Sequence, residues 1–175
     1  MMRRILCPTD LTDKSRDGVA CAIRLARENS AELIIFHATS FPTPNLYADE
    51  LLPYSHWERL ISEFRMDQVL QTAERRVKNF VESQFQTEIA DIAWRPEVAV
   101  GKLAEEVVAM AAGEQVNLIV MARKNKGVLA RIFSANTHEA VIRSAPCPVL
   151  SVDTEQVRDA SGWRLPLLKE VFQNS

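Results

Sequence analysis

The sequence predicts an open, doubly wound α/β domain, in which a five-stranded parallel sheet carries helices on both faces. Five short apolar runs alternate along the chain with longer amphipathic stretches of helix length. The runs are nearly continuous and contain many β-branched residues, as is typical of strands buried on both faces of a parallel sheet. Joined by right-handed crossovers, the order β-α-β-α-β-α-β-α-β gives this fold class.

The strands are expected where the apolar runs stand, at residues 5–7, 33–36, 98–100, 118–121 and 148–152. A short apolar run alone does not distinguish a strand from a buried piece of helix. Here the regular alternation with helical patterns decides in favour of strands.

The first two helices follow from the spacing of their apolar residues. Four residues share one face of the first helix: Val19, Ala22, Ile23 and Ala26. We expect a cap at Thr12 or Asp13 to start this helix. The second helix is expected over residues 55–85, after an approach that Pro53 interrupts.

The last two helices are expected over residues 104–112 and 136–144. Asn136, with Glu139 three residues later, has the pattern of a capping box, so Asn136 is predicted to be the N-cap. We expect residues 1–152 to form the domain. Residues 153–175 are then a tail, with a short helix that docks on the domain.

Composition argues against several classes of partner. Lys and Arg number 21 against 23 Asp and Glu, a formal net charge of -2, which gives no overall attraction to nucleic acid or an anionic membrane. No apolar run approaches the ~20 residues of a membrane span. The three cysteines are an odd number at wide spacing, which predicts reduced, unreactive thiols. We therefore expect a cytoplasmic protein with no nucleic-acid or membrane partner.

No common catalytic, metal or phosphate motif is present. The sequence contains neither Gly-x-Gly-x-x-Gly nor Gly-x4-Gly-Lys-Ser/Thr, and no Gly-x-Ser-x-Gly nucleophile elbow. His138-Glu139 begins like a zinc-binding helix, but Ile142 stands where the second histidine would be. We predict no catalytic residue and no metal site, and we expect His138 to be solvated.

Four segments together resemble one known family. They are ILCPTDLT (residues 5–12), AELIIFHA (31–38), GKLAEEV with NLIVM (101–107 and 117–121) and RSAPCPVL (143–150). In this order they resemble the universal stress protein A family over residues 3–152. The resemblance implies a sheet of order 3-2-1-4-5, a role in the stress response, a cytosolic location and a homodimer formed through the last strand.

One branch of this family binds ATP through a segment Gly-x2-Gly-x9-Gly-Ser/Thr, and the other branch lacks those glycines. Counted back from Pro146, the four positions are Ala122, Asn125, Ala135 and Asn136. Glycines let backbone N–H groups turn toward a phosphate at positive φ, where a Cβ would intrude. Ala122 and Ala135 would adopt that conformation at about 1–2 kcal/mol each. The resemblance therefore implies the branch without ATP.

Part of a nucleotide site nevertheless remains. Asp10 resembles the family's ribose or adenine contact, and the last helix offers its N-terminus to an anion. A basic loop at residues 123–131 could hold phosphate by side chains. Taken together, the candidate cofactor-binding residues are Pro8, Thr9, Asp10, Ala38, Met121, Ala122, Arg123, Asn125, Lys126, Ala135, Asn136 and Thr137.

Each of these features also has a purely structural interpretation. Asp10 can cap the turn that follows it, and Asn136 can occupy the helix amides that a phosphate would use. The basic loop can simply be solvated.

We therefore expect a dimeric regulatory or interaction module with no cofactor and an unknown protein partner. An apolar edge strand invites antiparallel pairing with its copy, after Pro148, which cannot donate to the ladder. The expected interface is Pro148, Val149, Leu150, Ser151 and Val152. Two alternatives stay open. The first binds ATP or another adenine nucleotide, with magnesium and slow hydrolysis, through Asp10, the basic loop and the last helix. The second is an enzyme acting on a small anion or phosphate ester.

Overall fold

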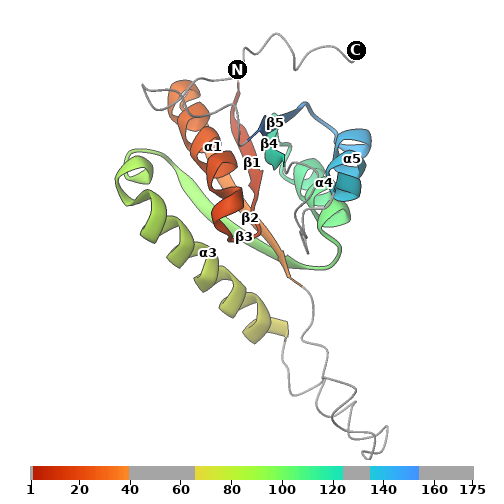
Figure 1. Ribbon diagram of the computed structural model, residues 1–175, viewed down its shortest axis with the longest axis horizontal. Coiled ribbons are helices and arrows are strands. Elements are labelled where there is room, and N and C mark those ends of the chain that lie inside the picture. The colour runs from red at the N-terminus through yellow and green to blue at the C-terminus, as the bar shows by residue number, and fades with distance from the viewer. Residues whose placement is uncertain (1, 40–65, 124–134, 154–175) are drawn as a thin grey trace, which may run out of the picture.

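The computed structural model describes residues 2–39, 66–123 and 135–153. Within these residues, five parallel strands form one sheet of order β3-β2-β1-β4-β5, which confirms the predicted order. The elements are β1 (Arg4–Pro8), η1 (Asp13–Ser15), α1 (Arg16–Asn29), β2 (Glu32–Thr39), α3 (Met66–Ile89), β3 (Trp94–Val100), α4 (Leu103–Gly113), β4 (Leu118–Arg123), α5 (Ala135–Ser144) and β5 (Val149–Asp153). Helices α1 and α3 cover one face of the sheet, and α4 and α5 cover the other (Figure 1).

Burial on both faces explains why the strands are nearly continuous apolar runs. Successive residues of β1 point to opposite sides, so Ile5 packs in the core cluster under α1 and α3. Its neighbour Leu6 packs in the second cluster under α4 and α5. Both side chains are fully buried, as are Ile34 and Ile35 of β2. Between its ends, a central strand with a core on each face has no position for a solvated side chain.

The end of α3 and the start of β3 differ from the prediction. Helical structure continues to Ile89, beyond the expected end at residue 85, but the backbone leaves helical geometry and kinks at Phe85 (φ -138°, ψ 24°), before the last turn that buries Ile89. Residues 55–65 of the predicted helix and the tail 154–175 lie outside the described residues. Strand β3 begins at Trp94, four residues before the expected run.

Two predicted helix caps are wrong. Thr12 precedes the short helix η1 without a side-chain cap bond, and α1 itself begins at Arg16. The Thr12 hydroxyl instead donates to Asp10 Oδ1 at 2.6 Å. Helix α5 begins at Ala135, so Asn136 lies inside the first turn and is not the N-cap.

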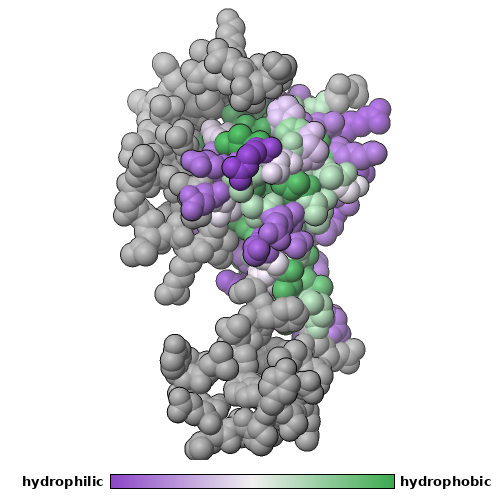
Figure 2. All heavy atoms as spheres, turned by 90° about the vertical axis from the view of Figure 1, so that its right-hand side faces the viewer, coloured by the Kyte–Doolittle hydropathy of each residue, from purple (hydrophilic) through white to green (hydrophobic). Residues whose placement is uncertain are grey.

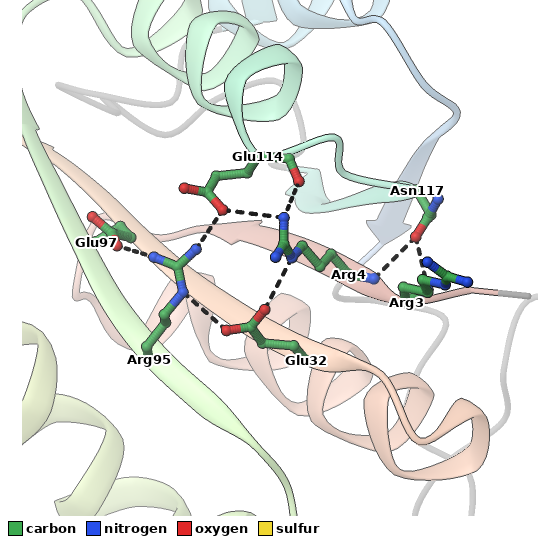
Figure 3. A network of polar contacts seen from close by, with 7 residues as sticks. All are labelled: Arg3, Arg4, Glu32, Arg95, Glu97, Glu114 and Asn117. Carbon is green, nitrogen blue, oxygen red and sulfur yellow. Dashed lines mark hydrogen bonds and ion pairs between the residues drawn. The ribbon is translucent and has the colours of Figure 1, made fainter.

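An ionic network joins three strands at the amino edge of the sheet (Figure 3). Glu32 of β2 accepts from Arg4 Nε through Oε2 and from Arg95 Nε through Oε1, each at 3.0 Å. Arg95 also pairs with Glu97, and its Nη2 donates to Glu114 Oε2 at 2.6 Å. Arg4 Nη1 donates to the Glu114 carbonyl at 2.7 Å, just after α4. The network therefore ties β1, β2 and β3 to the end of α4.

Asn117 fixes the beginning of β1 at the same edge (Figure 3). Its Oδ1 accepts from the backbone nitrogens of Arg3 at 2.7 Å and Arg4 at 3.0 Å. The backbone nitrogen of Asn117 in turn donates to the Arg4 carbonyl at 2.9 Å. Side chain and main chain thus hold the first strand against the segment that leads into β4.

The cysteine thiols are free, and burial makes the first two unreactive. Burial raises the pKa of Cys7 far above its usual range and raises the pKa of Cys21 to about 11, so neither forms the reactive thiolate at neutral pH. Cys147 is half-buried. Across the described residues, none of the helices has both the length and the apolar character needed to cross a bilayer. The same residues hold no cluster of three or more His, Cys, Asp or Glu side chains suited to a metal ion.

Candidate functional site

A cleft of about 670 Å³ opens at the carboxyl ends of the first three strands. Its walls come from Asp10 after β1, from His37, Ala38 and Thr39 of β2, from the start of α4 and from the start of α5, with Arg76 of α3 alongside. Ligands of doubly wound sheets bind at this carboxyl edge, and the volume lies within the usual range for small-molecule sites. We call this feature the carboxyl-edge cleft.

The turn after β1 fixes Asp10 on the cleft wall. Thr9 N donates to the Phe36 carbonyl at 2.8 Å, which extends the β1–β2 pairing by one residue. Leu11 then takes a left-handed φ of 59°, which reverses the chain. The backbone nitrogen of Thr12 donates to Asp10 Oδ1 at 3.1 Å. Asp10 therefore caps the turn that follows it through Oδ1, as its structural interpretation suggested. The residue also lines the cleft.

His37 is the most enclosed polar side chain of the cleft wall, with 3% of its surface exposed. Its Nδ1 lies 2.9 Å from the Thr9 carbonyl oxygen. Because a carbonyl oxygen only accepts, Nδ1 carries the proton and Nε2 of the neutral ring is an acceptor. Burial lowers the pKa of His37 and the Arg76 guanidinium lowers it further, against opposing effects of the Thr9 bond and Asp10. The ring is therefore neutral at pH 7.

The rim of the cleft carries charges of both signs. Gly101 N donates to the Thr39 carbonyl at 3.0 Å, which brings the start of α4 over the end of β2. Lys102 then pairs with Glu105 at 3.1 Å. With Arg76 and Asp10, two positive and two negative side chains line the described walls. Such a site can hold a ligand by hydrogen bonds at its inner wall and by local charge at its rim.

The predicted site residues fall into three groups. Those on the cleft wall are Asp10, Ala38, Asn136 and Thr137. Those buried behind the wall are Pro8, Thr9, Met121 and Ala122. For Arg123 and Ala135 the structure describes the backbone alone, and Asn125 and Lys126 lie outside the described residues with the rest of the basic loop.

Ala122 and Ala135 do not adopt the positive φ that a backbone wrapped around a phosphate would require. Among the described non-glycine residues, positive φ occurs at Leu11, Ser30 and Gln115. Ala122 instead continues the β4 ladder opposite Val152, and Ala135 is the first residue of α5. Neither alanine is therefore destabilised by a positive φ in this structure.

Sequence reasoning missed two residue roles at this end of the molecule. His37 was not among the candidates, although its place at the carboxyl end of the second strand was a usable signal. His138 was expected to be solvated, and this is wrong. It is half-buried, and its Nε2 lies 2.9 Å from Ser151 Oγ, so it connects α5 to β5.

Known proteins resemble this chain over nearly all of the described fold. Residues 1–153 match the Universal stress protein family. A universal stress protein of Methanocaldococcus jannaschii is 32% identical over 153 residues, which cover 87% of this chain and 82% of the relative. A universal stress protein of Thermus aquaticus is 27% identical over 154 residues, covering 87% of this chain and 99% of the relative.

Solved structures show the same fold. The universal stress protein UspA from Lactobacillus plantarum has a TM-score of 0.55 at 19% identity, covering 86% of this chain and 97% of its own. A universal stress protein in complex with cAMP has a TM-score of 0.52 at 24% identity, covering 87% of this chain and 98% of its own.

Proposed function

We propose that this chain, which belongs to the universal stress protein family, is a regulatory module of the branch that does not bind ATP. It acts by pairing with a second copy and with a protein partner, without catalysis. One observation carries the proposal: α5 begins with Ala135 and Asn136, where the ATP-binding pattern calls for Gly and Ser/Thr, and Asn136 lines the cleft. The three free cysteines support the cytoplasmic location that we propose for it.

The charges of the cleft support the same proposal. A triphosphate needs an excess of positive charge or a cradle of backbone N–H groups. Arg76 and Lys102 on the described walls are equalled in number by Asp10 and Glu105, and Lys102 is already paired with Glu105. These walls therefore offer no net positive charge to a triphosphate.

The edge strand supports the proposed homodimer. Ile119 N donates to the Pro148 carbonyl, so residues 148, 150 and 152 direct their backbone groups toward β4. Val149 and Ser151 consequently direct theirs away from β4, on the side where no other described strand pairs with β5. Leu150 and Val152 are 3% and 0% exposed, so the pairing that we propose uses main-chain groups and not these two side chains.

The helical face of α4 and α5 gives less reason to expect a docking surface. On the face that carries α4 and α5, hydrophilic and hydrophobic residues are mixed (Figure 2). Broad apolar patches are the usual sign of a protein interface, so we assign the pairing to β5.

Two measurements test this function. Titration of magnesium ATP in a calorimeter should give no binding at millimolar ligand, and sedimentation at micromolar protein should give twice the 19.8 kDa mass of one chain. A micromolar dissociation constant for magnesium ATP contradicts the branch assignment. A monomer at that concentration contradicts the assembly.

A second candidate function is supported by the cleft itself. About 670 Å³ suits a nucleoside or mononucleotide, and Asp10 and His37 place hydrogen-bond acceptors on its inner wall. The similar universal stress protein in complex with cAMP holds a nucleotide with a single phosphate. In this second candidate function, Arg123 and Lys126 of the basic loop bind the phosphate. Changing both residues to alanine should therefore weaken the binding of AMP or cAMP. Equal affinities for wild type and variant contradict it.

A further inference from the structure

We infer that His37 is the specificity-determining residue of the carboxyl-edge cleft, through a hydrogen bond that Nε2 accepts from the ligand. The cleft then selects small molecules that present an N–H or O–H donor to its inner wall, such as an amino-substituted nucleobase or a sugar hydroxyl. The inference rests on the second candidate function, in which the cleft holds a nucleoside or nucleotide.

The direction of Nε2 follows from its contacts. Nδ1 is directed at the Thr9 carbonyl oxygen, 2.9 Å away. No other hydrogen bond of the His37 ring is made within the described residues. No buried side-chain nitrogen or oxygen of these residues lacks a partner, so Nε2 must retain contact with solvent. Because His37 is 97% enclosed yet lines the cleft, that contact is with the cleft.

The chemistry of the inner wall sets the kind of group that fits. An ionised Asp10 carboxylate accepts hydrogen bonds and donates none, and a neutral histidine with a protonated Nδ1 offers only an acceptor at Nε2. A ligand carbonyl or ring nitrogen placed against Nε2 would leave two acceptors facing each other. A donor placed there takes over the contact that Nε2 otherwise makes with solvent in an enclosed site, which gives selection between ligands that differ in that group.

Four nucleosides test the inference, because three of them each lack one donor that the first carries. They are adenosine, purine riboside without the exocyclic amine, 2′-deoxyadenosine and 3′-deoxyadenosine. In the wild type, the analogue that lacks the donor facing His37 should bind about tenfold more weakly than adenosine. Which of the three analogues shows the loss identifies the donor as an amine or a hydroxyl.

Two substitutions separate ligand binding from a structural role of the ring. His37→Asn places an amide N–H near the position of Nδ1, so it keeps the bond to Thr9 and removes the outer acceptor. His37→Gln reaches further and keeps an acceptor in the cleft, at the expense of the Thr9 bond. In His37→Asn all four nucleosides should bind with the same affinity, because the group that distinguishes them is gone. The matched control is His138→Gln, on a histidine outside the cleft wall, which should keep the wild-type selectivity.

A spectroscopic measurement gives a second reading on the intact protein. The ¹⁵N resonance of His37 Nε2 should move on saturation with adenosine, since an accepted hydrogen bond changes the nitrogen lone pair. An unmoved resonance overturns the inference. So does equal binding of the four nucleosides to wild type, retention of selectivity in His37→Asn, or no binding of adenosine. None of those results bears on the proposed absence of ATP binding or on the proposed homodimer. Calorimetry with magnesium ATP and sedimentation test these two separately.

Discussion

Gly18 of α1 lies directly against Ala122 of β4. A Cβ placed on Gly18 would stand 2.9 Å from the Ala122 backbone nitrogen and 3.1 Å from its Cβ. Helix α1 thus makes a very close approach to the sheet at the strand that leads to the basic loop. The Ala122 methyl group is directed at α1 and not into the cleft.

The close approach predicts that Gly18→Ala destabilises the protein. The obstructing atom belongs to the backbone of β4, which is held in its ladder opposite Val152. Alanine improves helix propensity by about 1 kcal/mol, but overpacking costs about 1–3 kcal/mol, so the free energy of unfolding should fall by roughly 1 kcal/mol. Urea denaturation measures it. Gly113→Ala is the matched control, because nothing lies within 4 Å of a Cβ there, and its stability should not fall.

The same contact predicts that a glycine at position 122 brings no ATP binding. Removing the Ala122 methyl group leaves a small void beside Gly18 and adds backbone freedom, at about 1 kcal/mol of stability. Any affinity for magnesium ATP should come from Asn125→Gly, Ala135→Gly and Asn136→Ser. Calorimetry should therefore give the same affinity for this triple variant with and without Ala122→Gly. Tighter binding by the quadruple variant would show that the methyl group obstructs the nucleotide after all.

The lowered pKa of His37 predicts that the folded protein becomes less stable as the pH falls. Burial and Arg76 lower the pKa of His37 in the folded protein, with Asp10 acting in the opposite direction. Below the ordinary histidine pKa of about 6.5 the unfolded chain therefore binds the proton more readily than the folded one, and the free energy of unfolding decreases with decreasing pH. Urea curves at pH 7.5 and 5.5 should show a smaller loss for His37→Asn than for wild type. An equal loss would mean that this ring does not contribute.

The ion pairs of Glu32 at the amino edge of the sheet should stabilise the protein by an amount that depends on the salt concentration. Glu32→Gln weakens the contacts with Arg4 and Arg95 together, and because all three side chains are 30–41% exposed we expect about 1 kcal/mol of destabilisation. The difference from wild type should shrink in 1 M salt, where charges are screened within about 3 Å. Glu28→Gln, which breaks the single surface pair with Arg24, should change stability less. A loss at Glu32 that is independent of salt would indicate packing and not charge.

Ser151 offers a direct test of pairing at the edge strand. Its backbone N–H is directed away from β4, so Ser151→Pro removes a donor from the open edge and leaves the β4–β5 bonds in place. Sedimentation should show a monomer for this variant. Ser151→Ala loses the same hydroxyl bond to His138 but keeps the N–H, and it should remain a dimer. Dimers of both variants would place the interface elsewhere.

The central strands could be predicted because both of their faces are buried, which makes them apolar along their whole length. Strand β3 could be predicted only in its last part. Among the described strands it pairs on one side alone, with β2, and every residue of Trp94–Val100 is half-buried. An edge strand tolerates Arg95, Pro96 and Glu97, so its first half carries no apolar signal.

The candidate site could be predicted in the same partial way. Asp10 and Ala38 follow from their places at the ends of β1 and β2, where parallel strands meet at one edge. Arg76 could not be predicted, because α3 is brought to the cleft by packing and not by a local pattern. The ionic network of Arg4, Glu32, Arg95 and Glu114 joins four places far apart in the chain, and no motif marks it.

The hydrogen bonds that fix the beginning of β1 have a practical consequence for binding measurements on a surface. Asn117 and the network around Glu32 hold residues 3 and 4 at the amino edge, while the cleft opens at the carboxyl edge of the same strands. A tether joined ahead of Met2 will therefore attach the protein to a sensor chip with its cleft facing the flowing solution. Immobilised in this orientation, the molecule presents the described walls of the cleft in the same way to every nucleoside passed over it.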